Sequence, residues 1–113
     1  MVPLEAAVVV LVPFPFSDLS QAKLRPALVL AAAGRDDWIL CQITSNAYTD
    51  PDAVELVQAE FRSGSLRTTS FARPGKLFTA SGQLVTGRVG KLTAERFAAV
   101  LDAVIGMFEN SRP

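Results

Sequence analysis

Arg25 stands alone between a polar stretch and the apolar run Ala27–Ala31, where a permanently charged guanidinium could meet a phosphate or another oxyanion. It precedes Pro26, and a residue before proline avoids helical backbone, so the sequence predicts extended geometry for Arg25. A second apolar run, Trp38–Ile43, follows the turn-like sequence Ala-Ala-Gly-Arg-Asp-Asp. The two runs are therefore predicted to pair as a β-hairpin with Arg25 at its open end.

The assumed register of this hairpin brings Thr44 to Arg25. If residue 31 lies opposite residue 38, Arg25 lies opposite Thr44, and directly opposed residues share a face with Cβ atoms about 5 Å apart. A planar guanidinium and a neutral hydroxyl together suit a phosphate, although neither group is a natural general base. The other interpretation is structural: the arginine would cap carbonyls at the sheet edge, and the threonine would only favour a strand.

Composition limits the kinds of site that the chain can hold. Its 113 residues predict one domain over residues 1–113. With one cysteine and no histidine, we expect no disulfide framework, no metal site and no cofactor, and the usual general base is missing. Cys41 lies in an apolar run and is expected to be a small buried side chain. Ala6–Val12 is too short to span a bilayer and follows an acid, so we expect a cytoplasmic protein without membrane contact.

Charge is distributed unevenly along a chain whose net formal charge is zero. Residues 1–60 hold three basic and eight acidic side chains, whereas residues 61–94 hold six basic and no acidic ones. The basic segment contains Arg62, Arg67, Arg73, Lys76, Arg88 and Lys91. It predicts either a basic patch that binds a polyanion or a surface on which folding mixes both signs again.

Hydrophobic patterning predicts several short strands before one helix. The first expected strand is Val8–Val12, ended by Pro13 and Pro15, and the two runs of the hairpin follow it. The later expected strands are Val54–Val57, 67–73, 76–80 and Leu84–Val89. Polar segments predict loops at Ser17–Lys23 and Ser45–Asp52 and a turn at Ser63-Gly64.

The C-terminal segment carries the helical pattern. Thr93 is a predicted N-cap, and the inward face of the helix is expected to hold Phe97, Val100, Leu101, Val104 and Phe108. Several short strands followed by one helix predict a mainly antiparallel β-barrel with a C-terminal α-helix packed on it.

Seven short motifs lie in order along nearly the whole chain. They are Val9–Asp18, Lys23–Leu30, Ile43–Ser45, Ala53–Leu56, Ser70–Pro74, Lys76–Thr79 and Val89–Leu92. None of these pieces is distinctive alone, but together and in this order they resemble the PemK/MazF family of toxins from bacterial type II toxin–antitoxin systems.

This resemblance implies an SH3-like barrel of the PemK/MazF/CcdB type with a C-terminal helix, usually assembled as a homodimer. The implied activity is that of an mRNA interferase: metal-independent, sequence-specific cleavage of single-stranded RNA. In that reaction the ribose 2′-hydroxyl attacks the adjacent phosphate and leaves a cyclic phosphate and a free 5′-hydroxyl. The implied protein partner is a cognate antitoxin that covers the same groove.

The same resemblance assigns roles to particular residues. Arg25 of the Arg-Pro step, Thr44 after the second core strand and Arg73 match catalytic positions, where they would stabilise the negative charge of phosphoryl transfer. The loop after the first strand is where family members contact RNA. The residues expected to bind RNA are Phe16, Ser17, Asp18, Gln21, Lys23, Ser45, Asn46 and Lys76. Phe16 or Tyr48 would stack on unpaired bases, although Phe16 fits a core position equally well.

Two departures from the family pattern concern this site. Residues 6–8, Ala-Ala-Val, stand where many members have an Arg-Gly-Asp-type segment. Gly75 follows Arg73-Pro74 at a position where an aspartate is often found, and some members use that carboxylate in proton transfer. The general base is therefore unassigned; Asp18 could replace it by position, or it is an ordinary surface aspartate. The alternative function is a catalytically impaired member that binds antitoxin or RNA without cleaving it.

Two other classes of protein fit the sequence less well. Gyrase-directed toxins on the same fold depend on a C-terminal Trp-Gly-Ile, whereas this sequence ends Asn110-Ser111-Arg112-Pro113. A polyproline-binding module would need clustered aromatic side chains, and Trp38 stands alone inside an apolar run.

Overall fold

The computed structural model describes residues 3–15, 22–47 and 49–113. Within these ranges the chain forms seven strands, two short 3₁₀ turns and one α-helix. The strands are β1 (Val8–Pro15), β2 (Ala22–Ala32), β3 (Asp37–Thr44), β4 (Val54–Leu56), β5 (Phe61–Gly64), β6 (Ser70–Ser81) and β7 (Gly87–Leu92). The 3₁₀ turns are η1 (Gln58–Glu60) and η2 (Gly82–Leu84), and the helix is α1 (Ala94–Glu109).

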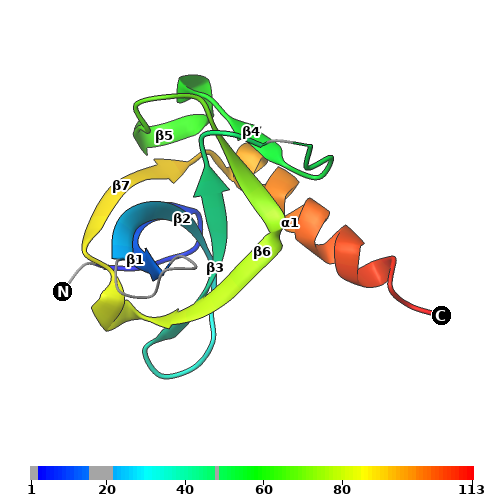
Figure 1. The fold of residues 1–113 in the computed structure, drawn as a ribbon, viewed down its shortest axis with the longest axis horizontal. Coiled ribbons are helices and arrows are strands. Elements are labelled where there is room, and N and C mark those ends of the chain that lie inside the picture. The colour runs from blue at the N-terminus through cyan, green and yellow to red at the C-terminus, as the bar shows by residue number, and fades with distance from the viewer. Residues whose placement is uncertain (1–2, 16–21, 48) are drawn as a thin grey trace.

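All seven strands belong to one antiparallel sheet with the order β4-β6-β3-β2-β1-β7-β5. Figure 1 shows this sheet curling into a nearly closed barrel, with α1 lying along its outside next to β6. The predicted fold class, a β-barrel with a C-terminal helix, is confirmed.

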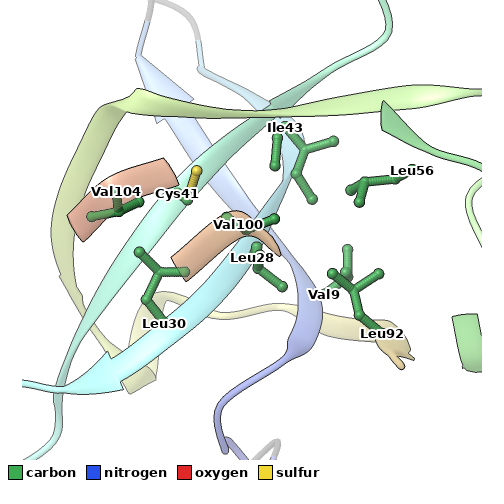
Figure 2. Packing of buried hydrophobic residues seen from close by; sticks show 10 residues of the cluster. Val9, Leu28, Leu30, Cys41, Ile43, Leu56, Leu92, Val100 and Val104 are labelled. Carbon is green, nitrogen blue, oxygen red and sulfur yellow. The ribbon is translucent and has the colours of Figure 1, made fainter. Parts of the chain in front are cut away.

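The middle of the sheet is apolar on both faces, which is why β1 and β2 lie there. On one face, called here the Val12 face, the buried side chains are Val8, Val10, Val12, Ala27, Val29 and Leu40. On the opposite face, called the helix face, Val9, Leu28, Leu30 and Cys41 pack against Val100 and Val104 of α1, as Figure 2 shows. Because side chains alternate along a strand, each strand contributes to both clusters.

The predicted β2–β3 register is wrong at the turn and right from Val29 to Ala27. Ala31 lies opposite Ile39 and Ala32 opposite Trp38, so the assumed pairing of residue 31 with residue 38 is off by one. The cause is a bulge between Val29 and Ala31, which adds one residue to β2. Beyond the bulge, Ala27 lies opposite Gln42, as the assumed register requires.

β1 continues through the two prolines that were expected to end it. Pro13 lies opposite Leu24 on β2, and β1 extends to Pro15. The pairing with β7 ends at Leu11, whose carbonyl accepts a hydrogen bond from the amide of Thr86 at 2.9 Å. The backbone N–H and C=O groups of successive residues point to opposite sides of a strand, so the backbone positions of residues 13 and 15 point to the same side as Leu11. On that side the pairing with β7 has ended. A proline there costs no ladder hydrogen bond.

Several other boundaries also differ from the predictions. β2 begins at Ala22, so Lys23 lies in a strand and not in the preceding loop. Ser63 and Gly64 belong to β5, where Gly64 adopts φ 68° and its Cα approaches the β7 backbone too closely for any side chain. The segments predicted as extended at 67–73 and 76–80 join into one strand, β6, which begins only at Ser70 and is interrupted by a bulge. The last strand starts only at Gly87.

α1 begins as predicted and ends differently. The hydroxyl of Thr93 accepts a hydrogen bond from the Arg96 amide at 3.2 Å, so Thr93 is the N-cap. Phe108, expected on the inward face, is 60% exposed, because the C-terminal end of α1 projects beyond the barrel (Figure 1). None of the helices in the described ranges is long and apolar enough to cross a membrane.

Candidate functional site

Arg25 is an exposed residue of β2 on the Val12 face. It lies directly opposite Val12 of β1, and Lys23 lies directly opposite Phe14. Alternation from the buried Ala27 places both basic side chains on this face. Extending the Ala27–Gln42 register by two residues places Arg25 opposite Thr44 of β3.

Thr44 is the last residue of β3, and its hydroxyl organises the loop that follows. Thr44 Oγ1 accepts a hydrogen bond from the Asn46 amide at 3.2 Å and lies 3.1 Å from the Asn46 carbonyl, to which it donates. This local turn leaves Ser45 and Asn46 exposed beside the strand end. Across the other edge of β3, Thr44 lies opposite Phe71 of β6.

Arg73 lies on β6 next to the buried Ala72, which faces Ile43. Ala72 belongs to the cluster on the helix face, and Arg73 follows it where the β3–β6 register shifts. Its Nε donates a hydrogen bond to Asp50 Oδ2 at 2.9 Å. Both side chains are largely shielded, since 23% of the arginine and 14% of the aspartate is exposed.

Asp50 is a site residue that the sequence analysis missed. It lies in the predicted loop Ser45–Asp52, where its Oδ1 also accepts a hydrogen bond from the Asp52 amide at 3.0 Å. The hydrogen bonds from Arg73 and from that amide, together with the positive charges of Arg73 and Lys76, hold the pKa of Asp50 below its ordinary value. A carboxylate in a turn carries no pattern that points to a partner in a distant strand.

A bulge in β6 shapes the backbone on which Arg73 lies. The register between β3 and β6 shifts between Cys41 and Ile43. The thiol of Cys41 donates to the carbonyl of Arg73 at 3.1 Å, and burial raises the pKa of this thiol to about 12, so it keeps its proton. Cys41 is fully buried, as predicted. Within the bulge, Gly75 is exposed, and a Cβ added there would lie 3.9 Å from Met107 Sδ, an ordinary contact.

The predicted site residues thus fall into two groups. Arg25, Thr44 and Arg73 lie on three adjacent strands, β2, β3 and β6. The exposed residues Lys23, Ser45, Asn46 and Lys76 lie on the same strands or directly after them. The other residues predicted to bind RNA lie outside the described ranges; they are Phe16, Ser17, Asp18 and Gln21. Tyr48, considered for base stacking, also lies outside them.

An apolar pocket of about 260 Å³ is lined in part by the β1 residues that pair with Arg25 and Lys23. It is lined by Val12, Pro13, Phe14, Phe78, Thr79, Ala80 and Leu84. The rings of Phe14 and Phe78 meet edge to face, with centroids 5.2 Å apart. Since Val12 and Phe14 lie opposite Arg25 and Lys23, an apolar surface and two cations stand side by side. Phe14 and Phe78 were not among the aromatic side chains predicted to contact RNA, which were Phe16 and Tyr48.

Folding partly neutralises the basic segment 61–94. Arg73 pairs with Asp50, while Arg88 and Lys91 approach Glu5 at 3.8 and 3.0 Å. The acids come from the N-terminal part of the chain, so the uneven charge along the sequence is mixed in space, as the second interpretation of the charge pattern expected. The candidate site for a polyanion is therefore indicated by Arg25 and Lys23 on the Val12 face, and not by the number of basic residues in segment 61–94.

The class of protein follows from a match over most of the chain. The model of the family described as PemK-like, MazF-like toxin of type II toxin–antitoxin system matches residues 5–108. The chain belongs to this family. No curated protein is significantly similar in sequence.

Solved structures support the same fold. A MazE–MazF complex from Deinococcus radiodurans has a TM-score of 0.74 at 18% identity, covering 94% of this chain and 96% of the other. An endoribonuclease in complex with its cognate antitoxin from a mycobacterial species has a TM-score of 0.73 at 15% identity, covering 99% and 100%. The Mycobacterium tuberculosis toxin MazF-mt6 has a TM-score of 0.66 at 18% identity, covering 88% and 96%.

Proposed function

We propose that this chain is a toxin that cleaves single-stranded RNA, in which the ribose 2′-hydroxyl attacks the adjacent phosphate. The observation that carries the proposal is the placement of Arg25, Thr44 and Arg73 on three adjacent strands, β2, β3 and β6. Family membership supports the same activity, and one of the similar structures is itself an endoribonuclease.

In this reaction the protein has to stabilise the negative charge that develops on the phosphate, and none of its side chains forms a covalent bond to the RNA. The 2′-oxygen forms a bond to phosphorus, the bond from phosphorus to the 5′-oxygen breaks, and the products are a cyclic phosphate and a 5′-hydroxyl. The exposed Arg25 guanidinium is suited to two parallel hydrogen bonds to the phosphate oxygens. Arg73 adds donors where negative charge develops, and the Thr44 hydroxyl can donate there once its proton turns away from the Asn46 carbonyl; neither contribution requires a metal ion.

Proton transfer from the 2′-hydroxyl has no obvious acceptor among these three residues. Gly75 has no side chain to serve, and both oxygens of Asp50 already accept hydrogen bonds. The lowered pKa of Asp50 makes that carboxylate a weak base as well. The positively charged site would instead lower the pKa of the 2′-hydroxyl itself, so that water can take its proton, and the departing 5′-oxygen takes a proton from water.

The remaining elements of the proposal concern partners and location. We propose single-stranded mRNA as the substrate, a cognate antitoxin that covers Arg25 and the adjoining pocket, a homodimer, and action in the cytoplasm, where mRNA is available. Two of the similar structures contain a toxin bound to its antitoxin, which supports the antitoxin partner. The apolar pocket beside two cations suits an antitoxin segment that is both apolar and acidic.

The test is induced expression followed by mapping of transcript 5′ ends. The wild-type chain should produce new 5′-hydroxyl ends at a recurring short motif. Arg25→Ala should abolish these ends, and Thr44→Val should sharply reduce them. Arg112→Ala is the control, because it removes an exposed arginine at the far end of α1. Cleavage at full rate by Arg25→Ala would refute the role of that residue. Binding of RNA or antitoxin without cleavage of any long transcript would establish the catalytically impaired alternative.

A further inference from the structure

The interaction between Asp50 and Arg73 joins two segments that are distant in the sequence. Asp50 lies in the loop between β3 and β4, whereas Arg73 lies on β6, 23 residues later. The contact is a charge-assisted hydrogen bond of 2.9 Å between partly buried groups. Such a bond holds a long side chain in one orientation more firmly than an exposed ion pair does.

The geometry of the contact leaves part of the guanidinium available. Asp50 binds Arg73 through Nε, and in the part of the chain that the structure describes this side chain has no other hydrogen bond or ion pair. The edge formed by the two Nη atoms is the edge that binds phosphate oxygens in pairs. The aspartate is the more shielded partner, at 14% exposed against 23% for the arginine, so it supports the arginine from the protein side.

Asp50 is itself held in place by its loop. Its Oδ1 accepts the Asp52 amide at 3.0 Å, its own amide donates to the Ala47 carbonyl at 3.0 Å, and its carbonyl accepts the Ala53 amide at 3.4 Å. The same loop begins at Thr44, whose hydroxyl bonds both backbone groups of Asn46. One short loop therefore contacts two of the three residues assigned to catalysis.

We propose that Asp50 is a positioning residue, which orients Arg73 so that its Nη edge faces the scissile phosphate. This inference rests on the proposed function and names a residue that neither the sequence motifs nor the family resemblance assigns. Asp50 does not touch the reacting atoms, and it acts only through Arg73. Its two hydrogen-bonded oxygens disfavour a role as general base, and its bond to Nε disfavours competition with the phosphate for the Nη edge.

The kinetic experiment compares five full-length proteins on an RNA oligonucleotide that contains the mapped cleavage motif: wild type, Asp50→Ala, Arg73→Ala, the double variant and Asp52→Asn. Asp52→Asn is the matched control, because it removes a charge from an exposed side chain in the same loop and keeps the amide that binds Asp50. Removal of one stabilising donor typically costs tenfold or more, so we expect kcat of Asp50→Ala to fall about tenfold, with KM nearly unchanged.

The double variant makes the kinetic result decisive. If Asp50 acts only through Arg73, the double variant should cleave as fast as Arg73→Ala alone, and Asp52→Asn should match the wild type. Losses that multiply in the double variant would overturn the inference, because they would require an independent role for Asp50. Faster cleavage by Asp50→Ala would also overturn it, since Asp50 would then compete with the phosphate.

A second measurement separates this inference from the proposed function. The Nε–H signal of Arg73 is followed by NMR while an uncleavable, 2′-O-methylated single-stranded RNA is added. We expect slow exchange of this proton in the wild type and in Asp52→Asn, a shift on RNA addition, and loss of protection in Asp50→Ala. A protected signal in Asp50→Ala, or no shift with RNA in the wild type, would overturn the inference. If no RNA is cleaved but the shift depends on Asp50, the proposed function fails and the positioning role stands.

Discussion

Two parts of the sheet position the two arginines of the candidate site by different means. Arg25 lies on β2 in the regular centre of the sheet, directly opposite Val12, with the backbone kept extended by Pro26. Arg73 lies at a bulge of β6, where its carbonyl accepts from Cys41 and its side chain is held by Asp50. The first arginine is positioned by strand register, and the second by contacts between residues 32 and 23 positions apart.

The difference determines how each arginine responds to change. A residue positioned by register depends on the whole central sheet, which is buried on both faces and tolerates a surface substitution. A residue positioned by side-chain contacts depends on a few named partners, so substitutions there alter both the site and the local stability. The following predictions test this contrast, beginning with the largest expected effect.

Arg25→Lys should reduce cleavage about 100-fold or more and leave the thermal midpoint nearly unchanged. Lysine keeps the charge but cannot form two parallel hydrogen bonds to a phosphate, and the exposed side chain is not part of the packed core. Cleavage assays and thermal unfolding of the same protein provide the two readouts. A large fall in the thermal midpoint would show that Arg25 stabilises the fold, and it would contradict the view that register alone positions this side chain.

Cys41→Ala should lower the free energy of unfolding by about 1–2 kcal/mol, because it removes a buried side chain and leaves the Arg73 carbonyl without its donor. Denaturant unfolding measures this change. The wild-type thiol, fully buried and with its pKa raised to about 12, should react with iodoacetamide only when the protein unfolds. Rapid labelling under native conditions would mean that the bulge opens freely.

Asp50→Asn should lower the free energy of unfolding by about 1 kcal/mol at pH 7 and by much less at low pH. The pKa of Asp50 is lower in the folded chain than in the unfolded one, so its stabilisation is complete above the ordinary carboxyl pKa of about 4. That stabilisation is lost as the pH falls through the lower, folded-state pKa. Urea unfolding at several pH values checks this, with Asp52→Asn as control. A difference that is independent of pH would contradict the ionic role.

Ala7→Gly should raise the free energy of unfolding by about 0.5 kcal/mol. Ala7 adopts φ 77°, a left-handed geometry that costs energy for any residue with a Cβ, and it is buried at the start of β1. Its backbone bonds Val29 and Leu92, so the geometry is required by the sheet. Denaturant unfolding is the measurement. A fall in stability would mean that the flexibility of glycine in the unfolded chain outweighs the relieved strain.

The regular part of the molecule was predictable because strand geometry is local. The barrel with its helix, the β2–β3 hairpin, the Thr93 cap and the burial of Cys41 all follow from patterns within short segments. The bulge after Val29 was not predictable, since it depends on how twisted strands fit together, but it lies on the turn side and leaves the Ala27–Gln42 register intact. The prolines in β1 were misread because a sequence pattern does not show where the neighbouring strand ends.

The sequence by itself determined which residues share a face in the centre of the sheet, because the period of two is a property of the extended backbone. It thereby placed Arg25 at the open end of the hairpin and towards Thr44. Only the tertiary structure decided that Asp50 holds Arg73, that Glu5 pairs with Lys91, and that Phe108 lies exposed beyond the barrel. These features depend on contacts between segments far apart in the chain, which no local pattern encodes.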